Sequence, residues 1–350
     1  YHLASDSVKY LGKVSEGSNK YLLSLGASLP VSDSMFVSGN NISVKNGVTL
    51  SFHRTTDEDS SFTVNNLTFG TGTSFSLEGS SATSGSDTLI VKGNFDGANL
   101  STFTTGGDSA MIEFSGSVDQ EFKLPTSTDY TIANIKVNNE NGNITYSGGD
   151  LTISQNLYLD DGVLNLGGKT LRLFQGNTDQ GFTKSTDDSY VANGFIVKGI
   201  QGGETAGAQR NYVRFPLGVA GDTLYRPLDF FITSDPVDSV EFTVGHVNSS
   251  PEGVNFSDAV TNAGVTKYPD FYWTVQSSEQ LGASFAYELH AQAEGYVLND
   301  NNPVSAMKVI HRAAGDSSQN EWKLLSSTYN SSVTSGNEPI VKATAATGGL

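Results

Sequence analysis

The stretch Gly142–Gln175 reads GNITYSGGDLTISQNLYLDDGVLNLGGKTLRLFQ. Apolar residues recur in it as pairs separated by one residue: Ile144 and Tyr146, Leu151 and Ile153, Leu157 and Leu159, Leu164 and Leu166, Leu171 and Leu173. A β-strand directs every second residue to the same face, so each pair supplies the inward side chains of one short strand. Glycine, aspartate, asparagine and serine, which favour turns, separate the pairs.

The pairs follow one another about every six to eight residues. This spacing is too close for ordinary hairpins, whose strands alone take roughly five to six residues. It suits a coil that makes three short strands in each turn of roughly twenty residues. Short units that cannot bury a face alone, but can do so when stacked, are typical of solenoids. The stretch therefore predicts a parallel β-helix.

The whole chain is predicted to be all-β, with an N-terminal parallel β-helix followed by an antiparallel immunoglobulin-like β-sandwich. We expect residues 1–33 to form a cap or to continue upstream rungs, 34–200 to form the β-helix and 201–350 the sandwich. The polar stretch between Phe174 and Tyr190 marks the transition, and Phe195–Ile200 is expected to be the last rung. Longer alternating strands follow, around a core of Trp273, Phe285, Tyr287, Leu289, Val309 and Trp322.

Composition narrows the classes of partner. The 350 residues carry a net charge of −17, so nucleic acid and an anionic membrane surface are disfavoured as partners. No apolar run is long enough to cross a bilayer, which predicts no membrane insertion. The chain has no cysteine, which fits a cytosolic protein or a bacterial exoprotein that is stabilised by repetition. The low lysine content and the abundance of asparagine, glycine and threonine favour the exoprotein. We expect a mature product or a fragment of a longer protein.

One further pattern carries a resemblance to a family. Its residues are Phe114, Gly116, Gln120, Ile135, Val137, Asn138, Asn139, Leu151, Ile153, Leu157, Gly162, Leu164, Gly167, Gly168, Leu171 and Leu173. In this order they resemble the rungs of adhesin-like β-helix proteins that Bacteroidota secrete or display, many of them through type IX secretion. The pairing of Phe215-Pro216 with Tyr225-Arg226-Pro227 resembles the join between helix and sandwich in the same proteins. The resemblance implies a location outside a Gram-negative cell and an architecture more than it implies an activity.

The histidines and acidic groups that could be catalytic or metal-binding have simpler structural roles. The five histidines (His2, His53, His246, His290 and His311) lack metal-ligand spacing, although His290 and His311 could lie on neighbouring strands. The acidic groups Asp57-Glu58-Asp59, Asp160-Asp161 and Asp187-Asp188 lie beside turn residues, where aspartate forms local hydrogen bonds. We therefore predict no catalytic, cofactor-binding or metal-binding residue.

Two weaker patterns remain. Leu298–Pro303 could hold calcium through carboxylate and carbonyl oxygens, but it lacks the full calcium-loop motif, so no cofactor is expected. Six Asp-Ser or Asp-Thr pairs precede an apolar residue, which resembles the O-glycosylation acceptor of exported Bacteroidota proteins: Asp6-Ser7, Asp33-Ser34, Asp87-Thr88, Asp108-Ser109, Asp222-Thr223 and Asp238-Ser239.

The leading functional hypothesis is a non-enzymatic, extracellular structural or adhesive surface protein that contacts glycans or surface proteins. One alternative is a subunit of an extracellular filament or of a secretion-linked assembly, which would self-associate. Another is a β-helix lyase or glycosidase. That enzyme would need basic residues and carboxylates gathered on one face, and the basic residues placed within the rungs are Arg54, Lys92, Lys136 and Arg172.

Overall fold

The structure is a computed structural model, and it is all-β, with 62% of the residues that it describes in strands and 3% in helices. It describes residues 36–44, 46–47, 49–53, 60–78, 87–173, 189–200, 212–234, 239–251, 255–279, 281, 285–296, 303–313, 321–333 and 338–347. The expected N-terminal cap, 1–33, lies outside these residues. The chain divides into two compact units, of which the first holds residues 1–174 with 181–190, and the second holds 175–180 with 191–350.

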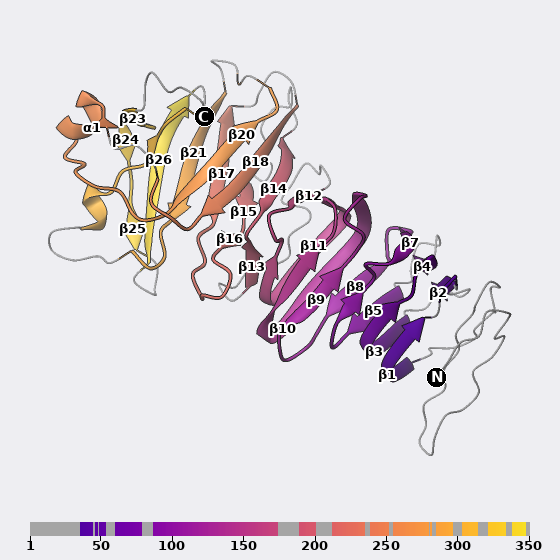
Figure 1. The fold of residues 1–350 in the computed structure, drawn as a ribbon. Coiled ribbons are helices and arrows are strands. Elements are labelled where there is room, and N and C mark those ends of the chain that lie inside the picture. Colours follow the sequence, from indigo (N-terminus) through magenta and orange to yellow (C-terminus); the bar gives the residue numbers. More distant parts are fainter. Residues whose placement is uncertain are drawn as a thin grey trace. The chain divides into compact units, whose positions relative to one another are not determined.

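The first unit is a β-solenoid of about five turns (Figure 1). Its strands pair in parallel with the strand one turn further along the chain, as Ile112 pairs with Ile135 and Ile135 with Leu157. The strands are β1 (Phe36–Val44), β2 (Thr49–His53), β3 (Ser60–Phe69), β4 (Thr73–Glu78), β5 (Asp87–Val91), β6 (Phe95–Asp96), β7 (Leu100–Gly106), β8 (Met111–Phe114), β9 (Gln120–Lys123), β10 (Tyr130–Ser147), β11 (Leu151–Asn165) and β12 (Thr170–Leu173).

Each turn contributes strand segments to three parallel stacks. The first stack runs through β1, β3, β5, β8, β10 and β11, and the second through β1, β3, β6, β9, β10 and β11. The third contains β2, β4 and β7, and then the first residues of β10 and β11 with β12. The prediction of three short strands in each turn is thereby confirmed. Long strands such as β10 turn a corner and belong to more than one stack.

The inward register predicted from the paired apolar residues is confirmed. All ten of these side chains, from Ile144 to Leu173, are buried. Aromatic rings extend the core toward the N-terminal turns, where the in-register pairs Phe75–Phe103 and Phe95–Phe122 have ring centroids 5.3 and 5.4 Å apart. Such ladders of like residues follow from the parallel pairing, which places each turn's inward side chains against those of the next.

Side chains of asparagine and aspartate fasten successive turns at the corners. Asn66 Oδ1 accepts a hydrogen bond from the backbone N–H of Asn94 at 2.7 Å, and Asn94 Oδ1 accepts one from that of Glu121 at 2.8 Å. Asp129 Oδ1 accepts a hydrogen bond from the backbone N–H of Asp150 at 2.9 Å, and Asp150 Oδ1 accepts one from that of Thr170, also at 2.9 Å. At corners the backbone leaves the strand ladder, so its N–H groups need such partners.

Two polar residues of the family-like pattern, Gln120 and Asn139, lie inside the solenoid. Gln120 is 1% exposed and donates to the Val91 carbonyl at 2.9 Å, while its Oε1 accepts from the backbone N–H of Gly116 at 3.0 Å. Asn139 is fully buried and donates to the same Oε1 at 3.0 Å. These two amides satisfy polar backbone groups of neighbouring turns inside the solenoid.

The second unit contains two larger antiparallel sheets. One is ordered β15-β17-β21-β26-β24, with β25 also paired to β26, and the other is β14-β18-β20. Their strands are β14 (Phe195–Ile200), β15 (Tyr212–Phe215), β17 (Leu228–Ser234), β18 (Val240–Val247), β20 (Tyr272–Ser277), β21 (Ala286–Gln292), β24 (Thr328–Tyr329), β25 (Ser332–Val333) and β26 (Pro339–Thr347). Phe195–Ile200, expected as the last rung, pairs antiparallel with β18 within this unit.

Aromatic side chains of the two sheets meet. Phe230 of β17 stacks on Phe242 of β18, with centroids 5.3 Å apart at 25°, and Phe285 lies 6.0 Å from Phe242. Phe285, Tyr287, Leu289 and Trp322 are buried, as the predicted core requires. Trp273 and Val309 are only half-buried. Trp273 instead donates from Nε1 to the Arg226 carbonyl at 2.9 Å.

The remaining elements of the second unit are short. They are β13 (Ser189–Ala192, whose last two residues belong to this unit), β16 (Leu217–Gly218), β19 (Asn255–Phe256), β22 (Ile310–His311), β23 (Glu321–Leu324), the helix α1 (Asp258–Asn262) and the 3₁₀ turn η1 (Val304–Ala306). The Ser257 hydroxyl caps α1 by accepting from the Val260 N–H. No helix of the described residues is long and apolar enough to cross a membrane.

Candidate functional site

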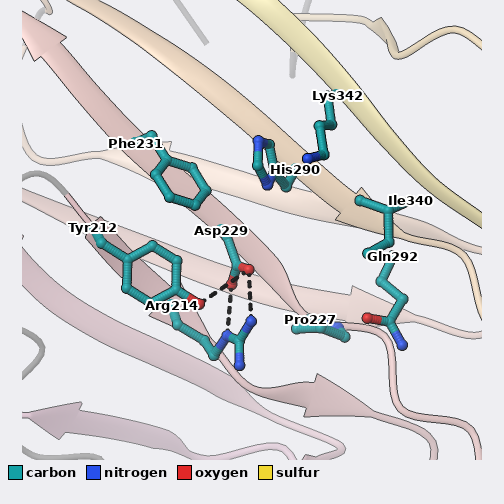
Figure 2. A pocket seen from close by; sticks show the side chains of 9 residues that line it. All are labelled: Tyr212, Arg214, Pro227, Asp229, Phe231, His290, Gln292, Ile340 and Lys342. Carbon is teal, nitrogen blue, oxygen red and sulfur yellow. Dashed lines mark hydrogen bonds and ion pairs between the residues drawn. The ribbon is translucent and has the colours of Figure 1, made fainter. Parts of the chain in front are cut away.

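A pocket of about 300 Å³ lies on the face of the sheet β15-β17-β21-β26 that is turned away from its core (Figure 2). Alternation along the strands creates this face. In β17, Leu228, Phe230 and Ile232 are buried on one side, whereas Asp229 and Phe231 line the pocket on the other. In β21, Tyr287 and Leu289 point to the core and His290 lines the pocket. Period-two alternation therefore separates core from site within each strand.

Four strands contribute directly opposite residues to one row across the floor. Arg214 pairs with Asp229, Asp229 with His290, and His290 with Lys342. We call these four residues the polar row. Directly opposite side chains in an antiparallel sheet lie roughly 5 Å apart at Cβ, so residues up to 128 positions apart in the sequence become neighbours.

The polar row contains a bidentate ion pair between Arg214 and Asp229. Arg214 Nε donates to Asp229 Oδ1 and Arg214 Nη2 donates to Oδ2, both at 3.0 Å. The Tyr212 hydroxyl also donates to Asp229 Oδ2, at 3.1 Å (Figure 2). Burial opposes the charge on Arg214, but the hydrogen bond and the charge of Asp229 outweigh it and raise the pKa of the guanidinium. Asp229 is thus held in place as an acceptor of three hydrogen bonds.

Three rings form a continuous strip beside this ion pair. Tyr212 and Phe231 lie with centroids 4.8 Å apart, and Phe231 and His290 lie 4.3 Å apart. We call Tyr212, Phe231 and His290 the aromatic strip. All three side chains are half-buried, so part of each remains accessible to a ligand. Pro227, Gln292 and Ile340 complete the lining at the other end of the pocket.

The acidic groups around the pocket are held by neighbours. Glu288, two residues before His290 in β21, forms a close contact between its Oε1 and His290 Nε2. Glu338 Oε2 accepts a hydrogen bond from Gln292 Nε2 at 3.0 Å. Lys342 differs, because its Nζ forms no ion pair within the described part of the chain. In Figure 2 its amine points toward the His290 ring.

A second polar cluster surrounds Arg226, in the segment that the sequence singled out as a join. Arg226 is 5% exposed, donates to the Glu294 carbonyl and to Asn248 Oδ1, both at 2.9 Å, and lies 3.7 Å from the centre of the Phe271 ring. Burial and the nearby Arg226 charge lower the pKa of His246 to about 4. Arg226 itself is buried, and the cluster ties the Leu217–Arg226 hairpin to its neighbours, so we assign it a structural role.

The structure separates the other residues weighed from the sequence. His246 belongs to the Arg226 cluster, His290 to the pocket, and His311 lies in β22, where burial and then the charge of Lys323 lower its pKa. Asp160 pairs with Lys136 at 3.0 Å on the solenoid. His2, Arg54, Asp57–Asp59, Asp187-Asp188 and 298–302 lie outside the described residues, and of His53 only the backbone, at the end of β2, is described.

Basic residues do not gather on one face of the described solenoid. Lys136 is in register with Glu113 and Tyr158, whereas Arg172 is in register with Thr152 in a different stack. Lys92 follows β5, two turns before Lys136. Among the described residues no three histidine, aspartate or glutamate side chains approach closely enough to hold a metal ion.

The Asp-Ser and Asp-Thr pairs differ in accessibility. Thr88 is buried and the Ser109 hydroxyl is enclosed, whereas Thr223 and Ser239 are exposed. Asp6-Ser7 and Asp33-Ser34 lie outside the described residues, as does Asp238.

Sequence reasoning did not find the pocket. Its residues come from 212–214, 227–231, 290–292 and 340–342, and no local motif links them. The available signal was a polar or aromatic residue at alternate positions of strands whose other positions are apolar, as in Tyr212-Val213-Arg214-Phe215.

Comparison of the chain with protein-family models, with curated proteins and with solved structures found no match.

Proposed function

We propose that this chain is a non-enzymatic, extracellular structural or adhesive surface protein whose second unit binds a glycan in the pocket beside the aromatic strip. The observation that carries the proposal is the combination in one pocket of accessible rings with fixed planar hydrogen-bonding groups. The second unit is, in this proposal, an immunoglobulin-like sandwich, and the solenoid is the element that displays it.

The lining chemistry suits a sugar. The C–H face of a pyranose ring is apolar and packs on aromatic side chains such as Phe231. Its hydroxyl groups come in adjacent pairs that match planar polar groups, and the Arg214–Asp229 pair and the Gln292 amide supply such groups. A volume of about 300 Å³ lies at the lower limit for ligand pockets, which fits one sugar residue of a longer chain.

The state of the carboxylates favours binding over hydrolysis. Glycosidases need one carboxyl group able to give up a proton and a second that acts as a base or nucleophile. Asp229 accepts hydrogen bonds from Arg214 and Tyr212, and Glu288 contacts His290, so neither is arranged as a proton donor to a glycosidic oxygen. This supports the reading that the pocket holds a sugar without cleaving it.

The solenoid adds a regular outer surface. In the third stack Ser74 and Ser76 of β4 are in register with Thr102 and Thr104 of β7. Hydroxyl groups repeated at the spacing of neighbouring strands offer many equivalent weak contacts, and several copies on one surface would bind with high avidity. An origin on a Bacteroidota cell, with type IX secretion, rests on the sequence resemblance alone and is part of this proposal.

The test is glycan-array binding by the full 350-residue chain, compared with the Phe231→Ala and Tyr158→Ala variants. Tyr158 is a half-exposed aromatic residue on the solenoid, so its variant controls for the loss of an outward ring. We expect the wild-type chain and Tyr158→Ala to bind the same glycans, Phe231→Ala to lose them, and no bound glycan to be cleaved. Absence of all glycan binding, or equal binding by Phe231→Ala, would overturn the proposal.

A further inference from the structure

One charged side chain of the pocket lining forms no ion pair among the described residues. Asp229 is matched by Arg214, Glu288 contacts His290, and Glu338 accepts from the Gln292 amide. Lys342 is left as the one lining charge that no side chain of the described residues pairs. Lys342 is therefore the lining charge that is available to a carboxylate of a ligand, in a chain whose net charge is −17.

Lys342 is also held where a ligand would reach it. It lies directly opposite His290 in the β21–β26 pairing, so it adjoins the end of the aromatic strip. The side chain is half-buried, and a ligand that covered it without an opposite charge would remove water from an unpaired ammonium group. Such burial is costly, so the site disfavours a neutral sugar and favours an anionic one.

We propose that the pocket is specific for an acidic sugar, a hexuronate residue whose ring packs on Phe231 and whose carboxylate pairs with Lys342. This inference rests on the proposed glycan-binding function and adds the class of sugar and the residue that selects it. The carboxylate would receive a charge-assisted hydrogen bond from Nζ, while Asp229, already held by Arg214, accepts from a ring hydroxyl. The acidic surface elsewhere repels uronate polymers, so binding would be confined to this site.

The test uses oligosaccharides that end in galacturonate, glucuronate, mannuronate or guluronate, each beside its methyl ester. The ester keeps the ring and hydroxyl groups, removes the charge and adds one methyl group. Titration calorimetry would compare the full chain with Lys342→Met, Lys342→Arg and Lys323→Met, where Lys323 is an exposed lysine of β23 in the same unit. Equal melting temperatures would show that the variants are folded.

We expect the full chain to bind at least one uronate about tenfold or more tightly than its ester, which is what one charge-assisted contact supplies. Lys342→Met should abolish the difference, whereas Lys342→Arg and Lys323→Met should keep it. Raising the salt concentration should weaken binding of the acid and leave binding of the ester almost unchanged.

Other outcomes would overturn the inference. If acid and ester bind equally, or if Lys342→Met keeps the preference for the acid, the pocket binds glycans without selecting for charge, and only the acidic-sugar inference fails. If a short peptide with a free C-terminal carboxylate competes as well as the uronate, the site recognises carboxylates rather than sugars. If no oligosaccharide of any kind binds, both the acidic-sugar inference and the proposed function fail.

Discussion

Asn66 Oδ1 accepts a 2.7 Å hydrogen bond from the backbone N–H of Asn94, which lies 28 residues later and one turn further along the solenoid. The same side chain donates from Nδ2 to Asn41 Oδ1, also at 2.7 Å, on the preceding turn. A single amide therefore joins three successive turns at one corner. Repetition of this contact explains how short strands with polar corners stay in register along the stack.

Substitutions of Asn66 should separate its two contacts. Asn66→Asp keeps an acceptor for the Asn94 N–H but cannot donate to Asn41, whereas Asn66→Ala loses both. We expect Asn66→Ala to lower the free energy of unfolding by about 1–2 kcal/mol and Asn66→Asp to have a smaller effect. Urea denaturation curves of the solenoid signal would measure both, and equal losses would contradict the importance of the Asn94 bond.

The inward register can be tested with two aspartates. Leu157 is fully buried, so Leu157→Asp places an unpaired charge in the apolar ladder and should cost about 4 kcal/mol or more, or prevent folding. Thr152 lies on the outer side of the same strand, in register with Arg172, so Thr152→Asp should change stability by about 0.5 kcal/mol or less. Similar thermal shifts for the two variants would show that the register is wrong.

Gly149 and Gly168 are glycines for two different reasons, close packing at the first and a left-handed backbone conformation at the second. A Cβ on Gly149 would lie 2.0 Å from the Thr128 carbonyl oxygen of the preceding turn, whereas a Cβ on Gly168 meets nothing within 4 Å but has a φ of +85°. Gly168→Ala should therefore cost about 1–2 kcal/mol through backbone strain. Gly149→Ala must separate two turns and should cost more, and the order of the two melting temperatures checks this.

Acid should destabilise the second unit through His246. Its pKa falls from about 6.5 in an unfolded chain to about 4 in the folded one, because burial and Arg226 disfavour the imidazolium. Between these values the unfolded state binds more protons, so stability is complete above pH 6.5 and decreases as the pH falls toward 4, by roughly 2–4 kcal/mol. His246→Gln should flatten this part of the pH profile. An unchanged slope would exclude His246 as its source.

The solenoid was predictable because its signal is local and repeated. Each apolar pair, such as Leu157 and Leu159, indicates which side chains point inward, and the spacing between pairs indicates the length of a turn. Asparagine was interpreted as a turn residue within 142–175, but the role of the corner asparagines was not predicted, because Asn66 and Asn94 are adjacent only after the turns are stacked.

The pocket could not be predicted for the opposite reason. Arg214, Asp229, His290 and Lys342 form a row only when four strands pair antiparallel in a particular register, and a shift of one residue would turn each of them into the core. Alternation in each strand was visible in the sequence, but the pairing of the strands was not. For the same reason Trp273, expected in the core, lies half-buried against the Arg226 carbonyl.

The most direct test of the account is a crystal structure of the full chain with the tightest-binding oligosaccharide from the uronate panel. The account predicts a sugar ring packed on Phe231 in the pocket, with its carboxylate within hydrogen-bond distance of Lys342 Nζ and a hydroxyl group at Asp229. A sugar bound on the outer face of the solenoid, or an empty pocket at saturating oligosaccharide, would contradict it.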